Sequence, residues 1–199
     1  MLEAKERSGI MILFIDACVR AESRTRELAE AVLSHLGKEG TEVERVRLYE
    51  CGLMPLTVED MGKRDEALMR DDFSDPFFDP ARQFAEADCI VMAAPYWDLS
   101  FPAILKLYLE KVSVNGITFM YDSEGVPHGL CRAEKLYYVT TSGGEIGDYN
   151  FGYDYVKALT MGLYGVRDSV CIRAVGLDLK DVDADKVLDN AKAQLKDVL

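Results

Sequence analysis

One stretch decides the predicted fold: Cys89-Ile-Val-Met-Ala-Ala-Pro-Tyr-Trp-Asp-Leu-Ser-Phe-Pro-Ala-Ile-Leu-Lys106. It opens with an unbroken apolar run, Ile90 to Ala94, and such a run predicts a strand buried on both faces of a parallel sheet. Pro95 ends the run, because proline cannot donate to a strand ladder. Pro102 begins a predicted helix, since its missing N–H is not needed in the first turn. The stretch therefore predicts a strand, a loop and a helix in succession.

The loop between that strand and that helix carries three aromatic side chains, Tyr96, Trp97 and Phe101. In open α/β sheets, ligands bind beyond the carboxyl ends of the strands. A flat aromatic loop at such a strand end is a natural platform for a flat ligand, although buried packing of the same rings is the ordinary alternative.

Outward from this stretch, strand patterns and helix patterns alternate along the chain. The other predicted strands are 10–15, 43–48, 135–140 and 169–175, and the other predicted helices are 23–36, 57–70, 81–87, 153–164 and 183–198. Alternating strands and helices predict a three-layer α/β fold with a parallel sheet and right-handed crossovers. Five strands favour the order 2-1-3-4-5, whose switch point lies between the first and third strands.

Length and composition limit the possible classes of protein. The 199 residues fit one domain, 1–199, with a long insert at 50–87, and 49% hydrophobic residues can bury a sizeable core. No apolar run approaches the roughly 20 residues of a membrane span, and the charged segment Met1 to Gly9 holds no signal-peptide core. The net charge of −12 argues against nucleic acid or an anionic membrane as a partner.

Cysteine and histidine are sparse. Five cysteines lie far apart, at Cys18, Cys51, Cys89, Cys131 and Cys171. Without a close pair they form no zinc or iron–sulfur motif, and a reduced, cytoplasmic chain is expected. The two histidines, His35 and His128, offer little for a catalytic triad or a metal site, so no metal is expected.

The loop from Asp16 to Thr25 joins the first strand to the first helix. A helix amino end offers free N–H groups and a positive dipole end, which suit a phosphate. Ser23 and Thr25 can add hydroxyl donors, and Arg20 can add positive charge. The alternative, in which Ser23 only caps the helix and the arginines are solvated, stays open.

Three segments resemble one family in chain order. Ala-Pro-Tyr-Trp-x4-Pro-Ala-Ile-Leu-Lys, from Ala94 to Lys106, resembles the third-strand loop of flavodoxin-like NAD(P)H-dependent oxidoreductases, which include quinone reductases and FMN-dependent azoreductases. Arg-x-x-Ser-x-Thr, from Arg20 to Thr25, resembles the FMN phosphate loop of that family. Thr140 to Gly144 resembles its Thr-x-x-Gly-Gly loop, whose glycines let the backbone approach a planar ligand closely. The resemblance covers Ile10 to about Val175.

The resemblance implies a flavodoxin-like fold and a set of site residues. The implied FMN-binding residues are Cys18, Arg20, Ser23, Thr25, Pro95, Tyr96, Trp97, Asp98, Leu99, Thr141, Ser142, Gly143 and Gly144. The implied substrate pocket holds Phe101, Tyr149 and His128. The azoreductases carry Asn where this chain has Asp98, and because a carboxylate would be repelled by reduced flavin, its side chain is expected to point away. The backbone of this loop is expected to offer N–H groups to the flavin.

The resemblance also implies an activity. NADH or NADPH would donate a hydride to FMN, and a quinone, azo or nitro compound would then accept two electrons by ping-pong exchange, without a catalytic acid or base. A homodimer is implied, with its active site across the interface. The insert phenylalanines, Phe73, Phe77 and Phe78, either reach that interface or pack on their own domain.

Two other functions remain open at this stage. A flavodoxin-like electron-transfer protein would have the same fold. A low-molecular-weight phosphatase would use Cys18 as nucleophile and Arg24 as phosphate clamp, in a Cys-x5-Arg loop. Against the phosphatase, the loop lacks the glycine that a tight anion nest usually needs, and both Asp-Pro pairs fall in the middle of the chain.

Overall fold

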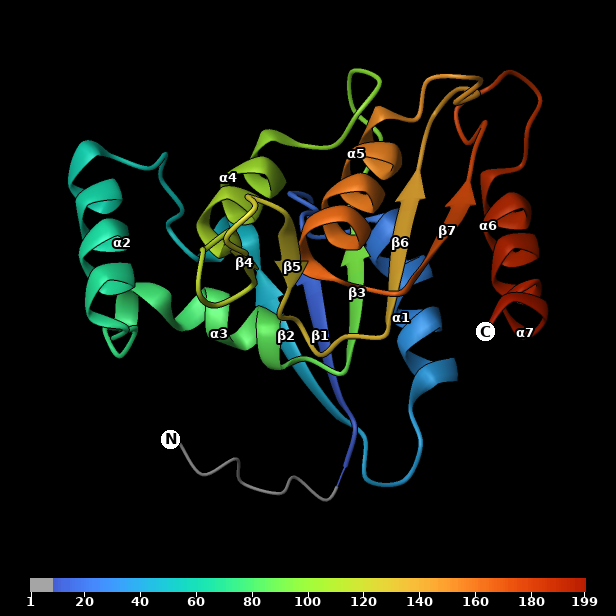
Figure 1. The fold of residues 1–199 in the computed structure, drawn as a ribbon. Helices are drawn as coiled ribbons and strands as arrows, with labels where there is room; N and C mark the ends of the chain where they lie inside the picture. The colour runs from blue at the N-terminus through green and yellow to red at the C-terminus, as the bar shows by residue number, and fades with distance from the viewer. Residues whose placement is uncertain (1–8) are drawn as a thin grey trace.

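Five parallel strands form a central sheet in the computed structural model, which describes residues 9–199 (Figure 1). In spatial order they are β2 (Glu42–Arg47), β1 (Met11–Asp16), β3 (Cys89–Ala93), β6 (Lys135–Thr141) and β7 (Asp168–Ala174). The labels β4 (Phe119–Tyr121) and β5 (Pro127–Gly129) belong to a separate antiparallel hairpin. The predicted order 2-1-3-4-5 is therefore confirmed. Most of the charged segment at the start, Met1 to Ser8, lies outside the described residues.

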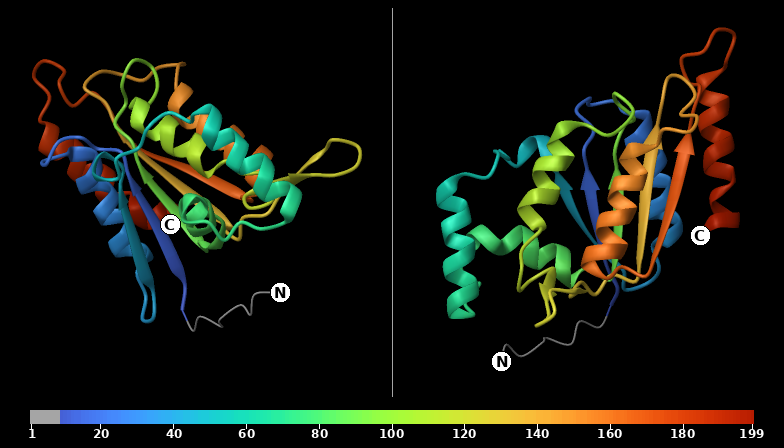
Figure 2. Two further views of the ribbon diagram at one scale, coloured as in Figure 1. Left: turned by 90° about the vertical axis from the view of Figure 1, so that its left-hand side faces the viewer. Right: turned by 45° about the horizontal axis from the view of Figure 1, so that its top comes forward.

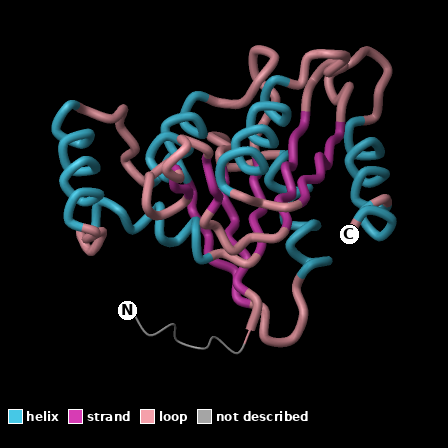
Figure 3. The backbone as a smooth tube through the Cα atoms, in the orientation of Figure 1, coloured by secondary structure: helices cyan, strands magenta, loops and turns pink. Residues whose placement is uncertain are grey.

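Helices cover both faces of the sheet, as Figure 3 shows. One face packs against α1 (Arg24–Leu36), α6 (Ala184–Ala193) and α7 (Leu195–Val198). The other packs against α3 (Asp79–Glu86), α4 (Ala103–Val112) and α5 (Phe151–Leu159), and α5 continues into a π-helical turn at Thr160–Tyr164. The closing helix predicted at 183–198 is divided into α6 and α7 at Gln194. None of the helices within residues 9–199 is both long and apolar enough to cross a bilayer.

The unbroken apolar runs are explained by two separate cores. In β1, Leu13 and Ile15 face the core beneath α4, whereas Ile12 and Phe14 face the core beneath α1. Every position of the strand is thus buried, because successive side chains point to opposite faces and both faces are covered. Each fully buried aliphatic or Phe side chain contributes about 1.5–3 kcal/mol to folding.

The insert between β2 and β3 builds a small layer of its own. It contains two 3₁₀ turns, Leu48–Glu50 and Pro76–Phe78, and the helix α2 (Val58–Arg70), which stands at the outer edge of the molecule (Figure 2). The rings of Phe73 and Phe77 contact Phe78 edge-on, with centroids 5.4 and 5.0 Å away. These aromatics pack within their own chain, on Ala81 and Val114, which is one of the two alternatives left open by the sequence.

Parallel pairing places the carboxyl ends of all five strands at one edge of the sheet. The loops that leave β1, β3, β6 and β7 meet there. Ser23 caps α1 as predicted, since its hydroxyl accepts from the Arg26 N–H at 3.3 Å. The fold therefore gathers the predicted ligand loops around the switch point between β1 and β3.

A matched pair of methionines tests the buried sheet. Met92 in β3 is fully buried, whereas Met69 in α2 is 80% exposed. We expect Met92→Ala to lower the free energy of unfolding by about 2–5 kcal/mol, because it leaves a cavity in the core. Met69→Ala should change it by less than about 0.5 kcal/mol. Urea unfolding measures both, and equal losses would contradict this burial.

Candidate functional site

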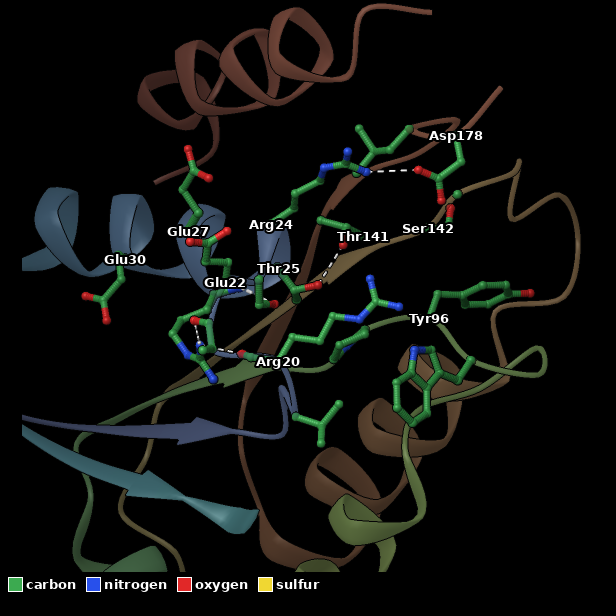
Figure 4. Close-up of a pocket in the computed structure, with 18 residues that line it drawn as sticks. Arg20, Glu22, Arg24, Thr25, Glu27, Glu30, Tyr96, Thr141, Ser142 and Asp178 are labelled. Carbon is green, nitrogen blue, oxygen red and sulfur yellow. Dashed lines mark hydrogen bonds and ion pairs between the residues drawn. The ribbon is translucent and has the colours of Figure 1, made fainter. Parts of the chain in front are cut away.

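A pocket of about 920 Å³ lies at the carboxyl edge of the sheet, where four loops meet (Figure 4). Its lining residues are Val19, Arg20, Ala21, Glu22, Ser23, Arg24, Thr25, Arg26, Glu27, Glu30, Pro95, Tyr96, Trp97, Thr141, Ser142, Gly143, Leu177 and Asp178. Most of the predicted cofactor-binding residues are in this set. The structure therefore brings together three segments that lie far apart in the sequence.

The β1–α1 loop presents backbone donors to this pocket. Within residues 9–199, the N–H groups of residues 19–23 have no hydrogen-bond acceptor, and the first N–H groups of α1 have no acceptor inside the helix. The positive end of the α1 dipole lies at the same place. This loop is therefore suited to bind an anion.

The three arginines of this loop differ in their partners. Arg24 contacts the Asp178 carboxylate at 3.0 Å, and Arg26 forms an ion pair with the buried Asp16. Among the residues that the structure describes, Arg20 has no carboxylate partner. Its side chain extends across the pocket toward Tyr96 (Figure 4). Among the described residues, Arg20 thus offers the pocket a guanidinium without an ion pair, and the Glu22 carboxylate, also without one there, lines the same pocket.

Two threonines tie the first loop to the β6 strand end. The hydroxyls of Thr25 and Thr141 lie 2.6 Å apart, and both residues are buried. Because only one hydroxyl can donate in that contact, the other keeps a proton for a further acceptor. Thr25 therefore lies at the predicted site, but its hydroxyl is shared with Thr141 rather than simply free.

The β3–α4 loop forms a tight hairpin. Trp97 N–H donates to the Ser100 carbonyl at 2.9 Å, and Ser100 N–H donates to the Trp97 carbonyl at 2.8 Å. The two residues between them have left-handed backbones, with φ of 51° at Asp98 and 68° at Leu99. A left-handed non-glycine residue costs roughly 1–2 kcal/mol, so this loop stores strain at the edge of the pocket.

A second pocket, also about 920 Å³, lies on the far side of this hairpin. Its lining residues are Tyr49, Trp97, Asp98, Ser100, Phe101, Pro102, Ala103, Ile104, Lys106, Phe151 and Tyr155. It is mainly aromatic and aliphatic, whereas the first pocket is mainly polar. Trp97 lines both. Asp98 lines the second pocket and not the first.

The β6–α5 and β7–α6 loops pair with each other. Asp178 N–H donates to the Gly143 carbonyl at 2.9 Å, and a Cβ on Gly143 would lie only 2.5 Å from a carboxylate oxygen of Asp178. A side chain at 143 would therefore displace the Asp178 carboxylate, whose side chain is 71% exposed and pairs with Arg24. Gly144 has open space around it and does not line the pocket.

Some predicted residues lie outside both pockets. Leu99 is half exposed on the hairpin tip, and Tyr149 lines neither pocket, although its carbonyl accepts from the Tyr96 hydroxyl at 2.6 Å. His128 lies on β5 and contacts Asp122 at 2.8 Å. Beyond β5, Leu130 bonds to Thr118 past the end of α4, and the chain then enters β6 at its amino end. In the folded chain, His128 is therefore at the opposite edge of the sheet.

Cys18 belongs to the core rather than to the pocket. Its thiol is 4% exposed and lies 3.9 Å from the Ala93 carbonyl. Burial raises the pKa of Cys18 to about 12, so the thiol stays protonated at neutral pH. Arg24 is meanwhile paired with Asp178. The structure does not support the phosphatase alternative, because its nucleophile Cys18 is buried and its phosphate clamp Arg24 is paired with Asp178.

Sequence reasoning named Arg24 only for the phosphatase and missed other lining residues, namely Val19, Ala21, Glu22, Arg26, Glu27, Glu30, Leu177 and Asp178. The β7–α6 loop that holds two of them was open to prediction, since every loop after a parallel strand reaches the same edge. The contacts of Arg26 could not be predicted, because nothing in the sequence spacing links Arg26 to Asp16.

Comparisons with known proteins agree with this architecture. A family model described as a flavodoxin-like fold matches residues 11–199. An FMN-dependent NADH:quinone oxidoreductase of Clostridium perfringens is 33% identical over 184 residues, which cover 89% of this chain and 92% of that protein. The chain belongs to the flavodoxin-like NAD(P)H-dependent oxidoreductases. Another member of this family, the FMN-dependent NADH:quinone oxidoreductase of Lachnoclostridium phytofermentans, is 35% identical over 187 residues, covering 91% and 93% of the two chains.

Solved structures share the fold of this oxidoreductase family member. An azoreductase from Bacillus anthracis str. Sterne superimposes with a TM-score of 0.79 and 24% identity, over 95% of this chain and 98% of that one. An NAD(P)H:quinone oxidoreductase from Methanothermobacter marburgensis gives a TM-score of 0.75 and 18% identity, over 96% and 100% of the two chains.

The burial of Cys18 has a chemical consequence. At pH 8 in native buffer, we expect iodoacetamide to modify the exposed Cys51 about tenfold or more faster than Cys18. The pKa of both thiols is raised by burial, but only Cys18 is closed off from the reagent. Peptide mass spectrometry over a time course measures both rates, and denatured protein is the control for intrinsic reactivity. Comparable native rates, or aryl phosphate hydrolysis abolished by Cys18→Ser, would contradict this placement.

Proposed function

We propose that this protein is an FMN-dependent oxidoreductase that passes electrons from NADH or NADPH to a quinone, azo or nitro acceptor. One observation carries the proposal: a polar, N–H-lined pocket lies directly beside an apolar aromatic pocket, and Trp97 lines both. FMN would lie along the polar pocket, with its phosphate at the β1–α1 loop and its ring beside Trp97, and the adjoining aromatic pocket would receive the planar electron acceptor.

The phosphate would lie against the β1–α1 loop. Within residues 9–199, the N–H groups of residues 19–23 have no acceptor and Arg20 has no ion pair, and together with the amino end of α1 these groups favour an anion there. Ser23 and the Thr25–Thr141 pair add hydroxyls beside them. Each donor belongs to this chain and is in place without a ligand.

The ring would lie between the β3–α4 hairpin and the β6–α5 loop, on Pro95, Tyr96, Trp97, Ser142 and Gly143. The N–H groups of Tyr96 and Trp97 are already bound to Thr141 and Ser100. Within residues 9–199 the N–H of Gly143, which lines this pocket, has no acceptor, so it is a backbone donor available to the ring. The N–H groups of Asp98 and Leu99 also have no acceptor there, but these two residues lie at the hairpin tip and do not line this pocket. Bound FMN supplies the two-electron chemistry, and such donors stabilise the negative charge of its reduced form.

The electron acceptor would occupy the aromatic side of the site. Phe101, Phe151 and Tyr155 offer apolar faces to a planar ring compound. The nicotinamide and the acceptor would use this space in turn, which is a ping-pong exchange. The five cysteines are free, in keeping with work in the reducing cytoplasm.

A visible absorption spectrum tests the proposal. After incubation with FMN and desalting, we expect the protein to retain a flavin spectrum that bleaches anaerobically with NADH or NADPH and returns when a quinone is added. The protein without added flavin and free FMN with each nucleotide are the controls. A colourless protein would reject FMN binding. A retained spectrum that neither nucleotide bleaches would point instead to an electron-transfer protein.

We also propose that a second copy of the chain covers the aromatic pocket. Trp97, Phe151 and Tyr155 are 42%, 53% and 39% exposed and adjoin one apolar surface. Exposed aromatics gathered on one face are typical of protein interfaces, and burying them would close the acceptor space to water.

Light scattering after size-exclusion chromatography tests the dimer. The unmodified chain should elute with the mass of two chains, and Phe151→Glu should shift it toward one, because a buried charge at an interface is costly. Val126→Glu, at a 48% exposed position on the β4–β5 turn, is the control and should stay dimeric. A monomeric unmodified protein would reject this proposal.

A further inference from the structure

Arg26 binds the loop that leads into its own helix. We propose that Arg26, held by Asp16, is a positioning residue that shapes the β1–α1 loop for the phosphate group without binding the phosphate itself. The inference rests on the proposed function, since it assigns this role toward FMN.

The Arg26 guanidinium is almost fully used by its own chain. Its Nε donates to a carboxylate oxygen of Asp16, and Nη2 donates to the Cys18 carbonyl at 2.8 Å. Nη1 donates to the carbonyls of Arg20 and Ala21, at 2.8 and 2.7 Å. One side chain thus binds three carbonyls of the loop and the acid that begins it.

These contacts determine where the loop amides point. In a trans peptide, the carbonyl of one residue and the N–H of the next point in opposite directions. Because the carbonyls of Cys18, Arg20 and Ala21 face the guanidinium, the N–H groups of residues 19, 21 and 22 face away from it. Those are among the N–H groups that have no acceptor within residues 9–199.

The same contacts shape this loop in the way that a glycine shapes other anion-binding loops. Anion nests usually include a glycine with positive φ, but residues 16–25 contain none, and none of them has a positive φ. The loop instead depends on the planar five-donor fork of arginine, which can bind several acceptors in one plane.

The charge of Asp16 distinguishes two possible roles of Arg26, which are positioning the loop and binding the phosphate directly. Arginine in the first turn of a helix opposes the positive dipole end, and the buried Asp16 offsets this. The other oxygen of Asp16 accepts from the Cys18 N–H at 2.8 Å. One carboxylate therefore binds both the Arg26 guanidinium and the start of the loop. If Arg26 were a phosphate ligand, removing the Asp16 charge would strengthen phosphate binding. If it positions the loop, the same change must weaken it.

Paired titrations of FMN and riboflavin, followed by flavin fluorescence at fixed salt, test the inference. The two ligands share the ring, and riboflavin lacks the phosphate. We expect Arg26→Met to weaken FMN binding roughly tenfold or more, the effect of losing hydrogen bonds to a charged group, and to leave riboflavin within about twofold. Arg26→Lys should not restore it, because one ammonium cannot replace the fork. Asp16→Asn should also weaken FMN.

The control is Arg64→Met. Arg64 also donates to two backbone carbonyls, those of Glu110 and Lys111 at 2.7 and 3.1 Å, but lines neither pocket. Its loss should change neither affinity. Equal weakening of FMN and riboflavin by Arg26→Met would overturn the inference, and tighter FMN binding by Asp16→Asn would make Arg26 a phosphate ligand instead. An unmodified protein with no preference for FMN over riboflavin would overturn the proposed phosphate site and this inference together.

Discussion

The structure depends on the burial of one parallel sheet on both faces. Because β1, β3 and β6 are covered by helices on each side, their side chains are buried at nearly every position, and those of β1 and β3 are almost all apolar. Because these strands are parallel, the loops that leave their carboxyl ends collect at one edge of the sheet. The site is a consequence of that packing, since each loop there leaves a rigid strand end.

At that edge the chemistry is divided between two adjoining pockets. The β1–α1 side presents N–H groups, hydroxyls and the Arg20 guanidinium, and the β3–α4 side presents aromatic faces. The hairpin at Trp97 separates them, and its two left-handed residues show that the backbone is held there at an energetic cost. The polar side suits a ligand with an anionic end, and the aromatic side suits a planar partner placed next to it.

The loop at residues 16–25 shows which contacts a local sequence pattern predicts and which it does not. The helix cap at Ser23 is confirmed, because capping is a local interaction between residues three apart. The expected free hydroxyl of Thr25 is instead shared with Thr141, which lies 116 residues later in the chain. Cys18 lies in the predicted loop, yet its thiol points into the core. The sequence did not show this direction, because the alternation of side chains along a strand no longer applies beyond the end of the strand.

The sequence by itself determined the fold class, the strand order and the loops that meet at the site. The fold class and the strand order follow from apolar runs, caps and prolines, which act over a few residues, whereas the loops of the site were identified by their resemblance to those of the family. Only the tertiary structure decided that Arg26 binds the carbonyls of its own loop, that Gly143 makes room for Asp178, and that His128 lies at the far edge. Each of these three contacts or positions depends on which segments become neighbours in the folded chain. Contacts between distant segments produce no periodic pattern in the sequence, so they could not be predicted from it.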